Sequence, residues 1–244
     1  MTKVTGINTA GDIVGTYSDA SGGHGFLLKG GVLTTIDYPG SVHTYVQGLN
    51  DQGQVVGYSG PGGFVYDIAT QTFTPIQYPH ANPTYALAIN NSGMIVGYFR
   101  QNGINTGFEY FNGKFRAIAY PGSSETFVQA VSDTNLVIGA ATGLGSNQSF
   151  VLRQGNYDLI TIPGATEAWV TGINPKGTTL VGYYDTFSGF MGFVYKPSQG
   201  TERTIAFHGA FATTALGINS GGTVVGYFID TNNKTHGLMV TPSN

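Results

Sequence analysis

The chain has 244 residues, of which 41% are hydrophobic and only 9% are charged, with 38 glycines and no cysteine. A net charge of −3 without a Lys/Arg cluster predicts no nucleic-acid or membrane partner, and the absence of cysteine excludes disulfides, thiolate metal sites and cysteine nucleophiles. No apolar run is long enough for a membrane helix, and the first residues already match the repeat described next, so we expect no signal peptide in this chain.

One unit of 40 to 45 residues recurs along the whole chain, and its clearest marker is a Gly-Ile-Asn-type triplet followed by a tight turn. The triplets begin at residues 6, 48, 88, 130, 172 and 217. Each triplet ends one β-rich segment, and further segments follow it, such as QVVGYS (54–59), GFVYD (63–67) and FTPIQYP (73–79) in the second unit. Segments rich in Val, Ile, Phe, Tyr and Thr and bounded by Gly, Asn, Asp and Pro are typical of antiparallel strands joined by hairpins.

Four short strands in a repeat of this length are typical of a β-propeller blade. We therefore predict an all-β fold, a six-bladed β-propeller of four-stranded antiparallel blades, forming one domain over residues 1–244. The blades are expected to begin near residues 2, 44, 84, 126, 168 and 213. The last unit stops before a fourth segment, so its blade is predicted to have three strands. We name the strands of each blade a to d, from the innermost outward.

The recurring pattern G-I-N-x-x-G-x-(I/V)-V-G-Y, the following H-G-F and the closing T-I-x-Y-P-G resemble the HAF-type extracellular repeats of bacterial proteins. This resemblance covers nearly the whole chain. It implies a secreted or surface-associated bacterial β-repeat protein, located outside the cell or in the periplasm. It implies no catalytic residues, so the function has to be argued from the site itself.

The strand directions predict that the b–c loops and the d–a connections share one end of the propeller. The short a–b and c–d turns would then lie at the other end. All five histidines fall in or beside the first set of loops: His24, His43, His80, His208 and His236. Because each d–a connection leads into the innermost strand, we expect a ligand site at this end of the central channel.

One position in the d–a connection varies between units while its neighbours hardly change. Two residues before the aromatic position of strand a, it holds His43, Pro83, Glu125, Glu167 and Ala212. Two carboxylates, one with a pKa raised by the other, and an imidazole could transfer protons. Glu125, Glu167 and His43 are therefore candidate catalytic residues of a cofactor-free hydrolase or lyase. The alternative is that they are ordinary side chains of a solvated rim.

A second candidate set consists of aromatic residues at the end of strand b, namely Tyr58, Tyr98, Tyr183 and Tyr227. Tyrosine offers an apolar face and a polar tip, which suits stacking on a sugar ring, although packing between blades explains the same pattern. We predict that these tyrosines, with Trp169, His80 and His208, bind a small polar ligand or a carbohydrate. Such binding is the preferred function, and the acid–base enzyme is the alternative.

The histidine and serine residues raise two further possibilities, metal binding and serine catalysis. His24 and His236 could bind a metal with Asp19 or Asp230, but H-G-F belongs to the repeat pattern itself and favours a scaffold role. We therefore predict no metal site and no cofactor. No G-x-S-x-G motif occurs, and no Ser-His-Asp triad can be identified from spacing alone.

Overall fold

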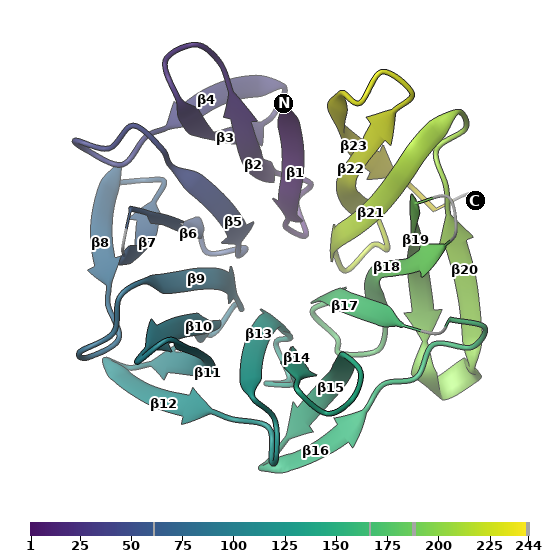
Figure 1. Ribbon diagram of the computed structural model, residues 1–244. Helices are drawn as coiled ribbons and strands as arrows, with labels where there is room; N and C mark the ends of the chain where they lie inside the picture. Colours follow the sequence, from purple (N-terminus) through teal and green to yellow (C-terminus); the bar gives the residue numbers. More distant parts are fainter. Residues whose placement is uncertain (61, 166, 187–188, 243–244) are drawn as a thin grey trace.

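The computed structural model describes residues 1–60, 62–165, 167–186 and 189–242. It confirms the predicted fold: six antiparallel sheets are arranged as blades around one axis, and the last has three strands among the described residues (Figure 1). A single short 3-10 helix, η1 (Pro197–Gln199), interrupts the otherwise all-β chain in the part that is described.

Chain order within each blade follows strand order from the axis outward. Blade 1 comprises β1 (Thr2–Ile7), β2 (Ile13–Ser18), β3 (Gly23–Lys29) and β4 (Val32–Ile36). Blade 2 comprises β5 (Tyr45–Leu49), β6 (Gln54–Ser59), β7 (Gly62–Asp67) and β8 (Thr72–Ile76). Blade 3 comprises β9 (Thr84–Ile89), β10 (Ile95–Gln101), β11 (Ile104–Phe111) and β12 (Lys114–Ile118).

The second half of the ring repeats this arrangement. Blade 4 comprises β13 (Glu125–Val131), β14 (Val137–Thr142), β15 (Gln148–Arg153) and β16 (Asn156–Leu159). Blade 5 comprises β17 (Ala168–Ile173), β18 (Leu180–Thr186), β19 (Gly189–Lys196) and β20 (Thr201–Ile205). Blade 6 comprises β21 (Ala210–Ile218), β22 (Val224–Asp230) and β23 (Thr235–Val240).

Hydrophobic packing joins each blade to the next. Ile36 at the end of β4, for example, packs with Val46 and Phe64 of blade 2, and all three are at most 2% exposed. The second strand of each blade carries a glycine because the backbone of strand a approaches it closely. A Cβ atom on Gly97 would lie 1.9 Å from the carbonyl oxygen of Tyr85, so any larger residue would push the two strands apart.

Every innermost strand contains a β-bulge immediately before the first residue of the triplet. In blade 2 the register shifts between Val46 and Gly48, which leaves Gln47 unpaired. A bulge redirects the extra side chain, and here it lines the axial channel. The six residues in this position are Thr5, Gln47, Leu87, Gln129, Thr171 and Leu216.

The asparagine of the triplet fastens the turns at the end of the propeller that carries the short hairpins. The Asn90 Oδ1 atom accepts hydrogen bonds from the Met94 and Ser92 amides, which closes the turn of its own blade. The Asn90 Nδ2 atom donates to the carbonyl oxygen of Ser132 in the next blade at 2.9 Å. Asn219 makes the same bond to the Asn8 carbonyl oxygen, so this column also closes the ring.

Candidate functional site at the long-loop end of the channel

Two cavities follow the axis of the propeller, one toward each end. The cavity at the short-turn end has a volume of about 340 Å³, and the cavity at the long-loop end has a volume of about 350 Å³. The two meet in the middle, where they share Tyr58 and five of the six bulge residues: Thr5, Gln47, Gln129, Thr171 and Leu216. The bulges therefore set the chemistry of the narrow part of the channel.

The cavity at the long-loop end, here called the upper cavity, has an aromatic wall. Its aromatic lining residues are Tyr45, Tyr58, Trp169, Tyr183 and Tyr227. The Lys3 ammonium group lies 4.7 Å from the centre of the Tyr227 ring, within reach of a cation–π interaction. Flat apolar faces and one cation thus surround a space large enough for a small ligand.

The polar groups of the upper cavity fall into two classes. The Thr5 hydroxyl donates to the Val46 carbonyl oxygen at 2.9 Å, and the Thr171 hydroxyl donates to the Ala215 carbonyl oxygen at 2.7 Å. These threonines connect neighbouring blades. The half-buried Gln47 and Gln129 side chains, in contrast, make no hydrogen bond with another described residue, so their amides can bond to a ligand.

A chain of aromatic rings continues from the upper cavity through blades 2 to 4. Tyr45 stacks on Tyr58 at 4.9 Å, Tyr58 meets Tyr85 edge-on at 4.8 Å, and Tyr98 meets Phe127 at 5.0 Å. Burial raises the pKa of Tyr98 to about 12 and also raises the pKa of Tyr58. Both phenols therefore stay neutral near pH 7 and can donate a hydrogen bond.

The structure places most of the predicted ligand-binding residues around the channel. Tyr58, Tyr183, Tyr227 and Trp169 line the upper cavity, and Tyr98 lines the lower one. Tyr58 and Tyr98 also contact rings of the next blade, so the two interpretations of their pattern are compatible. His80 and His208 are exposed and belong to the lining of neither axial cavity.

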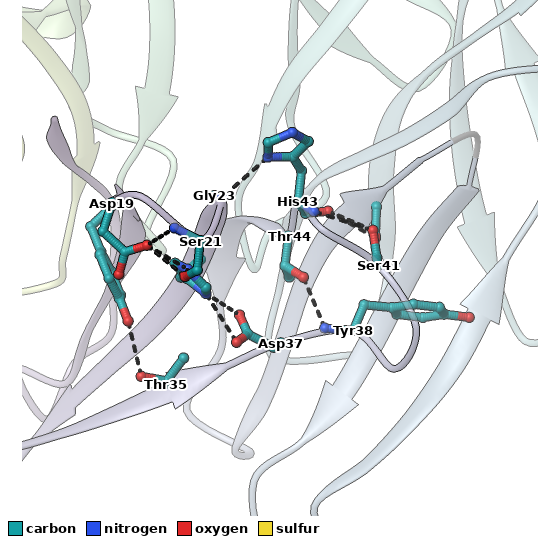
Figure 2. Close-up of polar contacts among 12 residues, drawn as sticks. Asp19, Ser21, Gly23, Thr35, Asp37, Tyr38, Ser41, His43 and Thr44 are labelled. Atoms are coloured by element: carbon teal, nitrogen blue, oxygen red, sulfur yellow. Dashed lines mark hydrogen bonds and ion pairs between the residues drawn. The ribbon is translucent and has the colours of Figure 1, made fainter.

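Glu125, Glu167 and His43 also lie outside the lining of both axial cavities. Glu125 accepts a hydrogen bond of 2.7 Å from Asn105 Nδ2, a side chain of the preceding blade. His43 Nδ1 accepts the Gly23 amide of the preceding blade at 3.0 Å (Figure 2). At these two positions, the variable residue of the d–a connection is therefore hydrogen-bonded to the b–c region of the preceding blade. Glu167 is half-buried in the corresponding segment of blade 5. The acid–base role of the three residues stays a prediction.

The structure also reveals a polar cluster that spacing alone did not identify (Figure 2). Ser21 Oγ lies 2.9 Å from His24 Nε2, and His24 Nδ1 lies 3.0 Å from Asp37 Oδ2. The Ser21 hydroxyl also donates to Asp19 at 2.6 Å. The hydrogen bond to Asp37 raises the pKa of His24, which favours a cation that donates to carboxylates on both sides rather than a base. The cluster therefore connects the b–c loop to strand β4 and its following residues.

Neither H-G-F-type histidine is placed as a metal ligand. The two ring nitrogens of His24 face different carboxylates, and His236 Nε2 pairs with Asp230 at 2.9 Å. Among the described residues no group of three His, Cys, Asp or Glu side chains is arranged to hold a metal ion.

The bulge residues are the channel-lining positions that the sequence interpretation missed. A signal was present, because the residue before each triplet is polar in four units and apolar in two (Thr5, Gln47, Leu87, Gln129, Thr171, Leu216), while the residues around it are nearly constant. Alternation along a regular strand would place this residue toward a neighbouring blade. Only the register shift directs it to the axis.

Comparisons with known proteins support the fold and go no further. No family profile matches the chain, and no curated protein matches it in sequence. A gluconolactonase from Xanthomonas campestris shares 13% identity at a TM-score of 0.60, with 99% of this chain and 86% of that chain covered. The β-propeller domain of the Trilobed protease from Pyrococcus furiosus, which has an open velcro topology, shares 10% identity at a TM-score of 0.58, covering 97% and 78%.

TolB from Acinetobacter baumannii is also similar, at 13% identity and a TM-score of 0.64. This comparison covers 84% of our chain but only 54% of TolB, so the chain spans about half of that protein. At these identities the likeness is one of fold. In addition, no helix among the described residues is long and apolar enough to cross a membrane.

Proposed function

We propose that the protein binds a small polar ligand carrying a flat apolar face, with a carbohydrate as the preferred class, in the upper cavity. The observation that supports this most directly is the combination of Trp169, Tyr183 and Tyr227 with the amides of Gln47 and Gln129, which bond to no described residue, around about 350 Å³ of space. Sugar rings present C–H groups on their faces and hydroxyls at their edges. Aromatic faces contact the former, and amides bond to the latter.

The charge of the lining narrows the ligand class. Apart from the tyrosines, Lys3 has the ionisable side chain among the described lining residues of the upper cavity, and Met1, whose amino group is also basic, lines it as well. A neutral sugar, or one with a single carboxylate that pairs with Lys3, would suit this lining. A cationic or strongly anionic ligand would not.

The acid–base alternative rests on Glu125, Glu167 and His43. The described lining of the upper cavity has no carboxylate and no imidazole, which favours binding over proton transfer there. Lactone and glycoside hydrolysis assays with wild type and Glu125→Gln test the alternative. Turnover abolished by the substitution would support it, and absence of turnover would remove it.

The binding proposal is tested by titrating the protein with a panel of neutral and carboxylated mono- and disaccharides, followed by calorimetry and by tryptophan fluorescence. We expect saturable binding of at least one sugar, with a change in Trp169 emission. Gln129→Leu should weaken this binding, while Thr34→Val, a change on the exposed surface of β4, should not. If no sugar in the panel binds, or if the bound sugar is indifferent to Gln129→Leu, the proposal fails.

We also propose that the protein works outside the cytoplasm, in the periplasm or the extracellular space. This rests on the resemblance to HAF-type repeats alone. Fractionation of the native organism, with antibodies against the protein, tests it, and recovery with the cytoplasmic fraction would contradict it.

A further inference from the structure

The interface that closes the ring, between blades 6 and 1, is built differently from the five others. Blades 1 to 5 each have a fourth strand, whereas β23 is the outer edge of blade 6 in the described part of the chain (Figure 1). A hydrophobic cluster spans each of the other interfaces, from blades 1 and 2 to blades 5 and 6. In the complete blades, the fourth strand packs against specific groups of its own blade and of the next one. Counterparts of these groups are present in β23 and in blade 1.

The first receiving feature is a glycine in strand c. In four complete blades this glycine pairs with the isoleucine of strand d: Gly25 with Ile36, Gly63 with Ile76, Gly107 with Ile118, and Gly192 with Ile205. A Cβ on Gly25 would lie 2.8 Å from the Ile36 carbonyl oxygen. Blade 6 keeps this glycine as Gly237, whose Cβ would meet only side-chain atoms of blade 1, the nearest being Val4 Cγ2 at 2.8 Å.

The second feature is a threonine hydroxyl in the following blade. It accepts a hydrogen bond from the amide of the aromatic residue that comes two positions after the isoleucine of strand d. The four pairs are Tyr38 with Thr44, Tyr78 with Thr84, Tyr120 with Thr126, and Phe207 with Thr213, at 2.8 to 3.1 Å. Those threonines are at most 2% exposed. Thr2 occupies the same position in blade 1, where it is exposed and makes no side-chain hydrogen bond with a described residue.

The third feature is an aromatic face at the end of strand b. Phe228 of blade 6 lies between two rings, with Phe207 stacked on it at 3.9 Å and His236 at 4.9 Å. Tyr17 is the corresponding residue of blade 1. His24 stacks on Tyr17 at 5.0 Å, and among the described residues no second ring covers its other face.

The fourth feature is the exposure of the core residues. Val46, Ala86, Val128, Val170 and Ala215, which face the preceding blade from the innermost strand, are at most 1% exposed. Their counterpart Val4 is only half-buried. Met239 in β23 is 56% exposed, and the hydrophobic surface of this interface is therefore left partly open.

We propose that the edge of β23 binds an extended strand of another polypeptide, which carries isoleucine two residues before a tyrosine or phenylalanine. The backbone of this strand pairs with β23 in the manner of β-strand addition. Its isoleucine faces Gly237 and Val4, the amide of its aromatic residue donates to the Thr2 hydroxyl, and its aromatic ring covers Tyr17. Four complete blades of the same chain define this register.

The test uses a peptide that already has the required sequence. Residues 112–122, NGKFRAIAYPG, form the turn and fourth strand of blade 3. A fluorescent peptide of this sequence, titrated with the intact protein, should bind saturably by anisotropy. A peptide carrying Ile118→Asp should not bind, because the charge would be buried against Val4.

Protein variants then test the register. Thr2→Val should weaken peptide binding about fivefold, the usual effect of one lost hydrogen bond, and Tyr17→Leu should weaken it by a similar factor of about five. Thr34→Val, an exposed change in β4 away from the proposed site, should leave the affinity unchanged. Because the Thr2 side chain is exposed and bonds to no described residue, its substitution should leave folding intact.

Three outcomes would overturn the proposal. The first is equal binding of the peptide with and without Ile118→Asp, and the second is full affinity of the Thr2→Val protein. The third is a dimer in light scattering that the peptide dissociates, which would mean that a second copy covers the edge. The sugar titrations of the upper cavity are independent of all three results, because the two sites lie on different parts of the blades.

Discussion

The two ends of the axial channel are built from the same strands, but their polar side chains differ in whether they form hydrogen bonds within the protein. At the short-turn end, the Asn91 side chain bonds to the carboxylates of both Asp51 and Asp133, and Asn50 and Asn90 bond to the following blades. At the long-loop end, Gln47 and Gln129 bond to no described residue. The amides of Gln47 and Gln129 are therefore available to a ligand, whereas the polar side chains at the short-turn end are bonded within the scaffold.

The largest test of this contrast removes a scaffold amide. Asn90 is 3% exposed, and its side chain serves two blades. Asn90→Ala leaves buried amide and carbonyl groups without partners, so we expect a loss of about 3 kcal/mol in the free energy of unfolding. Urea denaturation measures it. Gln129→Leu is the matched change at the other end and should leave stability nearly unchanged; equal losses would erase the distinction.

The next test concerns the aromatic wall. Trp169→Ala removes the largest flat surface of the upper cavity, and we expect the affinity for the bound sugar to fall about tenfold, or about 1.4 kcal/mol. Calorimetry with the sugar identified in the titrations measures this. Trp169 is half-buried, so the variant should still fold. An unchanged affinity would place the ligand elsewhere.

A smaller effect is expected for Asp51, at the short-turn end of the channel. Partial burial acts to raise the pKa of Asp51, but the Thr9 amide, the Thr9 hydroxyl and Asn91 lower it on balance. A lowered pKa in the folded state adds stability above the unfolded value of about 3.9 and loses it as the pH falls through the folded pKa. Because Asp51 is exposed, we expect Asp51→Asn to cost about 0.5 kcal/mol at pH 7 and progressively less as the pH falls below the unfolded pKa. A loss that is the same in acid as at pH 7 would contradict this.

The smallest effect concerns the cluster on the rim of blade 1. The pKa of His24 is raised, so its contribution to stability is present below the unfolded value of about 6.5 and is lost as the pH rises through the folded pKa. Asp37→Asn should lower the pKa of His24, measured by NMR titration of the imidazole. An unchanged pKa would mean that Asp37 does not hold the ring.

The sequence predicted the fold because the period, the turn residues and the strand composition all repeat, and local patterns of this kind suffice to count blades and strands. The tyrosines at the ends of strands b were placed near the channel for the same reason. The bulge residues were missed because a register shift depends on pairing between strands, not on composition. Glu125 could not be matched with Asn105, or His24 with Asp37, because these contacts depend on how a loop meets a neighbouring strand or blade.

The six bulges make the axis of this propeller adjustable. Each bulge residue is the unpaired member of its strand, so exchanging its side chain leaves the ladder of its blade intact. Thr5 and Thr171 also carry a hydrogen bond to the neighbouring blade, which their exchange would remove. A new lining could be assembled one position at a time, with polar and apolar groups chosen independently around the circle. The side chains that line the channel can therefore change, in evolution or by design, with little effect on the fold.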